Sequence, residues 1–80
     1  KNEHDTETNI LKIEVKSEIF HTLNGLQESY KQLLILKYEL ELSYKEIALL
    51  LGMKEATIKT YLFRARKEFQ KKWRNIHDRI

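Results

Sequence analysis

Residues 42–69 read LSYKEIALLLGMKEATIKTYLFRARKEF, and the rest of the chain is organised around this stretch. Its first half predicts a short helix. The side chain of Ser43 can accept hydrogen bonds from first-turn amides, and Glu46 can reach back to the amide of Ser43, which is a capping box. Gly52 tolerates the left-handed conformation that ends a helix. The apolar residues expected to share one face of this helix are Ile47, Leu50 and Leu51.

A second, longer helix is expected from about Glu55 to about Trp73. Only a tight turn separates it from the first helix, so the two helices should cross steeply. The crossing needs a small residue where the helices approach, a residue that accepts a left-handed backbone at the turn, and an apolar residue between the helices. Ala48, Gly52 and Ile58 meet these needs at offsets of four and six residues. This spacing is typical of the helix-turn-helix, with an ordinary helical hairpin as the alternative. The residues expected to form the core of the motif are Ala48, Gly52, Ile58 and Leu62.

The second helix has two chemically different faces when its residues are placed 100° apart. One is an apolar stripe, with Tyr61 and Trp73 on its flanks, that consists of Ile58, Leu62, Ala65 and Phe69. The opposite face is basic and consists of Thr60, Phe63, Lys67, Lys71 and Arg74, flanked by Lys59 and Arg64. A solvated surface would explain the cations but not Phe63, which gains nothing from water. Contact with a partner, such as a thymine methyl group, explains Phe63 better.

The net charge of +3 is unevenly distributed along the chain. Residues 1–53 carry six Lys or Arg and nine Asp or Glu, a net −3, whereas residues 54–80 carry nine and three, a net +6. Positive charge is therefore concentrated on the second helix of the motif and the segment after it, as expected for binding a polyanion. A basic amphipathic helix could instead lie on a membrane, but its apolar stripe is assigned to the core.

Composition restricts the fold to one all-α domain. The 80 residues are 41% apolar and include no Pro and only two Gly, which argues against a chain rich in strands or loops. The absence of Cys excludes disulfides and thiolate sites, and no apolar run has membrane length. His4, His21 and His77 are too scattered for a metal site. We expect no catalytic site, metal or cofactor, and therefore no enzyme. A missing initiator Met suggests a fragment of a longer protein.

The residues before the motif predict two further helices. A polar segment, residues 1–9, is expected to fray, and a helix should run from about Thr8 to Leu23. Its expected core stripe is Leu11, Val15, Ile19, Leu23 and then Leu26. A second apolar group, Ile10, Ile13 and Phe20, indicates either a helix buried on two sides or contact with a missing domain or partner. Asn24-Gly25 breaks the helix, and another should run from about Gln27 to Leu40 with Tyr30 and Tyr38 at the core edge.

Together these residues resemble region 4 of a bacterial sigma-70 family factor of the extracytoplasmic-function (ECF) type. The resemblance covers about Ile19 to Phe69 and is carried by Leu23-Asn-Gly-Leu26, Tyr30, Leu34-Ile-Leu-Lys-Tyr38, Leu42-Ser-Tyr-Lys-Glu-Ile-Ala48, Leu51-Gly52, Thr57-Ile-Lys-Thr60 and Arg64-Ala-Arg66. It implies a four-helix, wingless helix-turn-helix domain, here residues 10–74, followed by a tail, 75–80. It also implies a cytoplasmic monomer that reads the −35 element of double-stranded promoter DNA and docks on the β-subunit flap of RNA polymerase. Many family members are inhibited by an anti-sigma factor.

The resemblance also assigns roles to single residues. Those that match the family's base-reading positions are Lys59, Thr60, Phe63 and Arg64. Those at positions expected to contact phosphate are Ser43, Tyr44, Thr57 and Lys67, to which we add Lys54 and Lys71. Backbone amides at the starts of the two motif helices could assist, because helix N-termini attract anions.

Three departures from the family pattern stand out. Gln27 replaces a usual Pro, which should loosen the start of its helix, and Tyr61 replaces a frequent Arg. Lys54-Glu55-Ala56 replaces a usual Ser-x-Gly, so the recognition helix lacks a side-chain cap worth about 1 kcal/mol. Lys54 could offer a phosphate contact instead.

Two other functions are compatible with the motif. A response-regulator output domain shares the Glu-Ile-Ala and Thr-Ile-Lys-Thr phrases, although such domains usually place a His where this chain has Tyr61. The second of these functions is a protein-interaction module whose helices mainly bind an inhibitor. Dimerisation would favour the response regulator, whereas a sigma domain should stay monomeric.

Overall fold

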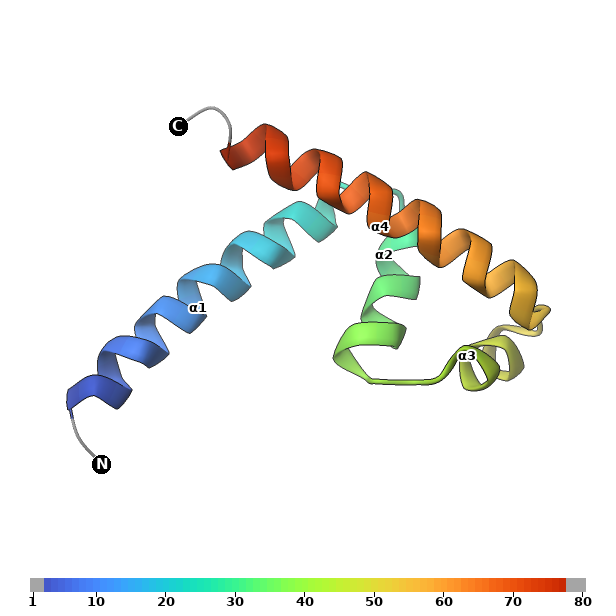
Figure 1. Cartoon of the computed structure of the whole chain (residues 1–80), viewed down its shortest axis with the longest axis horizontal. Coiled ribbons are helices and arrows are strands. Elements are labelled where there is room, and N and C mark those ends of the chain that lie inside the picture. Colours follow the sequence, from blue (N-terminus) through green and yellow to red (C-terminus); the bar gives the residue numbers. More distant parts are fainter. Residues whose placement is uncertain (1–2, 78–80) are drawn as a thin grey trace.

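The computed structural model describes residues 3–77, and side chains from residue 9 onward. The chain forms α1 (Glu3–Asn24), α2 (Glu28–Leu34), the π-helical turn η1 (Ile35–Glu39), α3 (Tyr44–Leu51) and α4 (Glu55–His77). In Figure 1, α4 crosses the molecule as one long helix, with α2 and α3 on one side of it and α1 diverging from its C-terminal half. No strand occurs within residues 3–77. The prediction of an all-α, four-helix domain is confirmed.

Both ends of α3 form as the sequence predicts. The amide of Glu46 donates to Ser43 Oγ at 3.0 Å, and the amide of Ser43 donates to Glu46 Oε1 at 2.8 Å, which completes the capping box. At the other end Gly52 has φ 66°, the left-handed conformation that its lack of a Cβ permits. The Met53 amide donates to the Ala48 carbonyl across this turn at 3.0 Å. Local hydrogen bonds therefore fix both ends of α3 and the turn that leads toward α4.

The core lies where α4 meets α2 and α3. Ile58, Leu62 and Ala65 of α4 have no exposed surface, and Phe69 packs against the same cluster. The full set of buried apolar residues is Leu23, Leu26, Leu33, Leu34, Ile47, Ala48, Ile58, Leu62 and Ala65. Ala48 is small and belongs to the same buried cluster as Ile58, as the crossing requires. Of the four residues predicted for the motif core, Ala48, Ile58 and Leu62 are buried, whereas Gly52 lies exposed at the turn.

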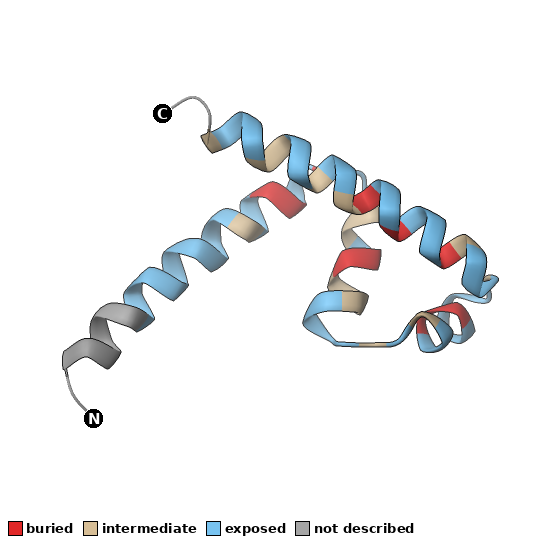
Figure 2. Ribbon diagram, viewed as in Figure 1, coloured by how far each residue is buried: buried red, intermediate tan, exposed pale blue. Residues whose placement is uncertain are grey.

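The prediction for the first helix is wrong in two respects. The helix begins at Glu3 rather than at about Thr8. Leu11 is 62% exposed and Val15 47%, so the expected core stripe is buried only at its end, where Leu23 and Leu26 join the core. Figure 2 shows the reason: only the last turns of α1 meet the other helices, so no described element covers Leu11 and Val15. Its second apolar group, Ile10, Ile13 and Phe20, is exposed as well, so the helix is not buried on two sides.

Two smaller expectations also differ from the structure. Leu50 and Leu51 do not share the buried face of α3, because only Ile47 and Ala48 reach the core from a helix of two turns. The helix expected over residues 27–40 divides into α2 and η1, and its π-helical turn carries Tyr38 to an exposed position. Tyr30 lies at the core edge as predicted, whereas Tyr38 is more than half exposed.

Candidate nucleic-acid interface

The outward face of α4 brings together the residues predicted to read bases. Lys59, Thr60, Phe63 and Arg64 are all exposed, on the side opposite Ile58 and Leu62. Phe63 is 54% exposed although it lies among cations. Lys67 and Lys71 continue the same face along the helix. We name this surface, which consists of Lys59, Thr60, Phe63, Arg64, Lys67 and Lys71, the basic face of α4.

Aromatic rings hold several of these cations. The Lys67 ammonium lies 5.4 Å from the centroid of the Phe63 ring, and the Arg64 guanidinium lies 5.8 Å from that of Tyr61. Both pairs are cation–π contacts, each worth about 0.5–1 kcal/mol at an exposed site. Tyr61, which replaces an Arg of the family pattern, thus supports Arg64 instead of adding a charge. A shallow hollow beside Phe63 is lined by Gln27, Tyr30, Phe63, Arg64, Lys67 and Glu68.

The start of α3 offers fewer backbone donors than expected. The amide of Ser43 is already bound by Glu46, so it is not available to a phosphate without breaking the capping box. This hydrogen bond is the main reason that the pKa of Glu46 lies below its usual value of 4.5. The hydroxyl hydrogen of Ser43 can still be donated to a phosphate while its oxygen accepts from Glu46. The predicted contact through the Ser43 side chain remains geometrically open.

The start of α4 presents Lys54 and Thr57 next to the basic face. The Lys54 carbonyl accepts from the amide of Ile58 at 3.1 Å, so the helix begins where the sequence predicts. A Lys side chain has no acceptor and cannot cap the first-turn amides. The exposed Lys54 therefore adds positive charge to the positive end of the helix dipole, where an anion is favoured.

Sequence reasoning missed one cation near this surface. Lys37 of η1 donates to the Leu42 carbonyl at 3.3 Å, and its ammonium lies 4.5 Å from the centroid of the Tyr44 ring. The ammonium of Lys59 lies 5.5 Å from the same centroid. Two lysines from separate helices therefore meet at Tyr44. The sequence carries no signal for this meeting, because it depends on how η1 approaches α4.

Arg66 connects η1 to α4 by a hydrogen bond. Its Nη1 donates to the hydroxyl of Tyr38 at 2.9 Å. This bond raises the pKa of Arg66 above its usual value, and the hydroxyl of Tyr44 adds to the same effect. Arg66 is thereby engaged within the protein, unlike its neighbours Arg64 and Lys67 on the basic face.

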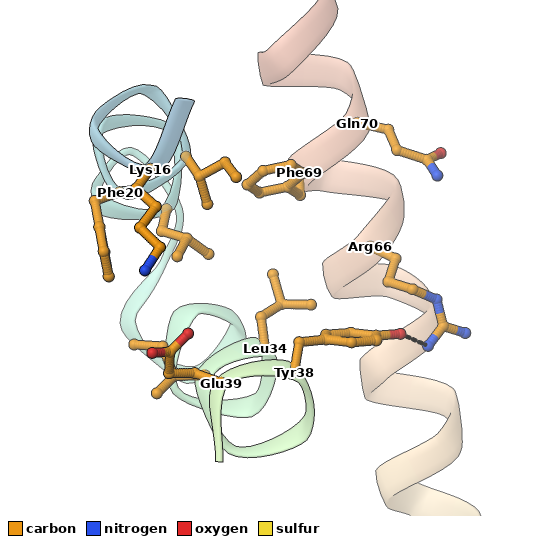
Figure 3. A pocket seen from close by; sticks show the side chains of 11 residues that line it. Lys16, Phe20, Leu34, Tyr38, Glu39, Arg66, Phe69 and Gln70 are labelled. Carbon is orange, nitrogen blue, oxygen red and sulfur yellow. Dashed lines mark hydrogen bonds between the residues drawn. The ribbon is translucent and has the colours of Figure 1, made fainter. Parts of the chain in front are cut away.

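A second surface lies between the last turns of α1, the end of α2 with η1, and α4. It is a groove of about 530 Å³ (Figure 3). The residues that line it are Lys16, Ile19, Phe20, Leu23, Leu34, Ile35, Tyr38, Glu39, Arg66, Phe69 and Gln70. Apolar side chains supply most of the lining, and Tyr38 with Arg66 forms one side. None of the α4 residues in the groove belongs to the basic face.

The steep α3–α4 crossing, the left-handed Gly52 turn and the basic face of α4 define a helix-turn-helix DNA-binding domain. Residues 16–69 match the family described as Sigma-70, region 4. The chain belongs to this family, as region 4 of an ECF-type sigma factor, which supports a role in promoter recognition through DNA binding.

One curated relative is the ECF RNA polymerase sigma factor SigM of Bacillus subtilis (strain 168), which is 34% identical over 58 residues. The match covers 72% of this chain and 36% of the relative, so the chain spans only about a third of that protein's length. No solved structure matches the chain significantly. No helix in the described part of the chain is long and apolar enough to cross a membrane. Within that part no cluster of His, Asp or Glu could hold a metal ion.

Proposed function

We propose that this domain binds the −35 element of promoter DNA through the basic face of α4, as the promoter-reading part of an RNA polymerase holoenzyme. The observation that carries the proposal is Phe63, a half-exposed aromatic ring among Lys59, Arg64 and Lys67. A solvated helix face would not favour it. An α-helix fits the major groove of B-DNA, where thymine methyl groups offer apolar contact.

The proposal divides the basic face into two kinds of contact. The first half of the face reads base edges: Arg64 is suited to a bidentate contact with guanine, and Phe63 to a thymine methyl group. Lys59 and Thr60 complete this set. The Thr60 hydroxyl donates to the Ala56 carbonyl at 3.1 Å, which leaves its oxygen free to accept. Phosphates are bound by Ser43, Tyr44, Lys54, Thr57, Lys67 and Lys71, which fix the orientation of the helix in the groove.

A helix of the polymerase β-subunit flap would occupy the groove between α1 and α4. Its apolar lining suits the apolar face of an amphipathic helix. The groove uses α4 residues that the basic face does not, so DNA and polymerase could be bound at the same time. The exposed Ile10, Ile13 and Phe20 on α1 favour a second partner, an anti-sigma protein that covers apolar surface.

Binding measurements with base-reading variants test this proposal. A binding site is first selected from random duplexes, and affinity is then measured for that duplex and a scrambled one. Arg64→Ala should cost about 1–3 kcal/mol on the selected duplex and far less on the scrambled one. Phe63→Ala should also lose discrimination with a change in stability below about 0.5 kcal/mol.

The matched control is Phe69→Ala, the same change on the inward face of α4. Because Phe69 packs against the core, this variant should lose about 1–3 kcal/mol of stability. If Phe63→Ala unfolds the chain while Arg64→Ala keeps full discrimination, the basic face is not the DNA-reading surface. A chain that dimerises on DNA would contradict the monomeric binding that this proposal expects.

A further inference from the structure

Tyr61 lies on the flank of α4, between the buried stripe of the helix and its basic face. It is 37% exposed, so the rest of the protein covers more than half of it, whereas Arg64 is exposed. Arg64 follows Tyr61 by three positions, which makes the two side chains neighbours on the helix surface. The Arg64 guanidinium lies 5.8 Å from the centroid of the Tyr61 ring. The better anchored ring therefore favours one arrangement of a long, mobile side chain.

The chemistry of this contact leaves Arg64 free to bind something else. A cation–π contact attracts the guanidinium charge to the face of a ring and uses none of the five N–H donors of an Arg side chain. A bidentate contact with guanine O6 and N7 uses two of these donors. A carboxylate in the place of the ring would accept such donors and neutralise the charge. The Tyr61 ring can thus hold Arg64 without competing with a base.

We propose that Tyr61 determines the DNA-sequence specificity of this domain, because its ring positions Arg64 in the free protein for one base pair and limits its reach to others. Tyr61 is a positioning residue, since it acts through Arg64. The inference rests on the proposed function, in which Arg64 reads a base. An Arg64 that is ordered before DNA arrives loses less conformational entropy in the correct contact. A contact that draws Arg64 away from the ring gives up the cation–π attraction.

The first test replaces the ring and measures affinity of the 80-residue chain for the selected and the scrambled duplex. Tyr61→Leu should lower the ratio of the two affinities by about two- to fivefold, the factor that an exposed cation–π contact supplies. The dependence of affinity on salt should stay as in the wild type, because no phosphate contact is removed. Tyr61→Phe keeps the ring and should keep the ratio. A wild-type ratio in Tyr61→Leu, or an equal loss in Tyr61→Phe, overturns the proposal.

A second substitution separates specificity from affinity. Tyr61→Arg adds a cation beside the basic face and removes the ring. It should bind the scrambled duplex more tightly and with a stronger dependence on salt, because added positive charge favours any duplex. The ratio of affinities should nevertheless fall, since Arg64 is no longer positioned. If Tyr61→Arg raises both affinities by the same factor, the ring does not contribute to specificity and the proposal is wrong.

A double-mutant cycle shows whether Tyr61 acts through Arg64. In the Arg64→Ala background, the further change Tyr61→Leu should leave the ratio of affinities unaltered. A further fall would mean that Tyr61 contacts DNA directly or supports the fold, and would overturn the positioning role. Melting curves provide the structural control: Tyr61 lies outside the buried cluster, so Tyr61→Leu should melt within a few degrees of the wild type.

The same measurements distinguish failure of the inference from failure of the proposed function. If Arg64→Ala lowers the ratio of affinities while Tyr61→Leu keeps it, Arg64 reads a base without help from Tyr61, and only the inference fails. If Arg64→Ala itself keeps the wild-type ratio, the proposed base-reading role of Arg64 fails and the inference fails with it.

Discussion

Glu41 is the one residue other than glycine with a positive φ, 55°, within the described part of the chain. It lies in the link between η1 and α3, where the chain turns toward the helix-turn-helix. The left-handed region costs an L-residue about 1–2 kcal/mol, because its Cβ crowds a carbonyl oxygen. This strain accompanies the turn that brings Tyr44 close to Lys37.

Replacement of Glu41 by Gly should therefore stabilise the domain by about 1 kcal/mol, as measured by denaturant unfolding. Glu39→Gly is the matched control, because it removes the same charge two residues earlier. Glu39 lies in η1, where a Gly should cost about 0.5–1 kcal/mol. Similar losses in both variants would show that the strain at residue 41 is not relieved by Gly.

The capping box of α3 gives a second prediction, which concerns pH. The pKa of Glu46 is lowered in the folded state by the hydrogen bonds from Ser43. Its contribution to stability is thus complete above the ordinary value of 4.5 and is lost as the pH falls through the lower folded pKa. Stability curves of the wild type and Glu46→Gln should differ by a constant amount at neutral pH. The difference should shrink below about pH 4.5. A difference that does not change with pH would contradict the assignment of this contribution to the Glu46 carboxylate.

Single residues were predictable where their partners are close in sequence. Ser43 and Glu46 are three positions apart, and Gly52 follows its helix directly, so spacing alone identifies the capping box and the turn. The meeting of Lys37 and Lys59 at Tyr44 was not predictable, because it joins residues 22 positions apart in the sequence. Long-range pairs depend on helix crossings, which local patterns do not encode.

At the scale of elements, α2 begins without a side-chain cap. Gln27 occupies the N-cap position with φ −62° and ψ 150°, and its amide side chain donates to Ser29 Oγ at 2.9 Å. A proline ring fixes φ near this value. The backbone at Gln27 therefore already has the conformation that the Pro usual in the family would impose.

Gln27→Pro should stabilise the domain by about 0.4–1 kcal/mol, because it restricts the unfolded chain at a position whose folded φ it matches. Thermal unfolding of the variant measures this gain. Gln32→Pro, inside α2, should instead cost about 3 kcal/mol or more through a lost hydrogen bond and a clash. A loss of stability in Gln27→Pro would mean that Leu26 cannot accept the restriction that a following Pro imposes.

Helices were predicted well where another element of the fold covers their apolar stripe. The stripe of α4 from Ile58 to Phe69 was correct, since α3 and α2 cover it. The stripe of α1 was not, because Leu11 and Val15 have helical spacing but no element opposite them. Periodicity shows that a helix has an apolar side, and it does not show what covers that side. The π-helical turn η1 was also missed, because residues 35–39 carry no Gly or Pro to mark a change of helix type.

At the scale of the whole molecule, the chain is extended rather than compact. Its radius of gyration is 15.3 Å, against about 12 Å for a compact domain of this length. The difference comes from α1, which diverges from the other helices (Figure 1). Small-angle X-ray scattering of the monomer should give a value near 15 Å. A value near 12 Å would show that α1 folds back and covers its apolar residues in solution.

The molecule is also flat, with principal extents of 47 × 34 × 15 Å. Its smallest extent is little more than one helix diameter, about 10–12 Å. Since so few side chains are removed from water, unfolding should change the heat capacity by a small amount. The enthalpy of unfolding is then small as well, and the thermal transition is broad. The shape that leaves α4 accessible from several sides thus also gives a shallow stability curve and a broad melting transition.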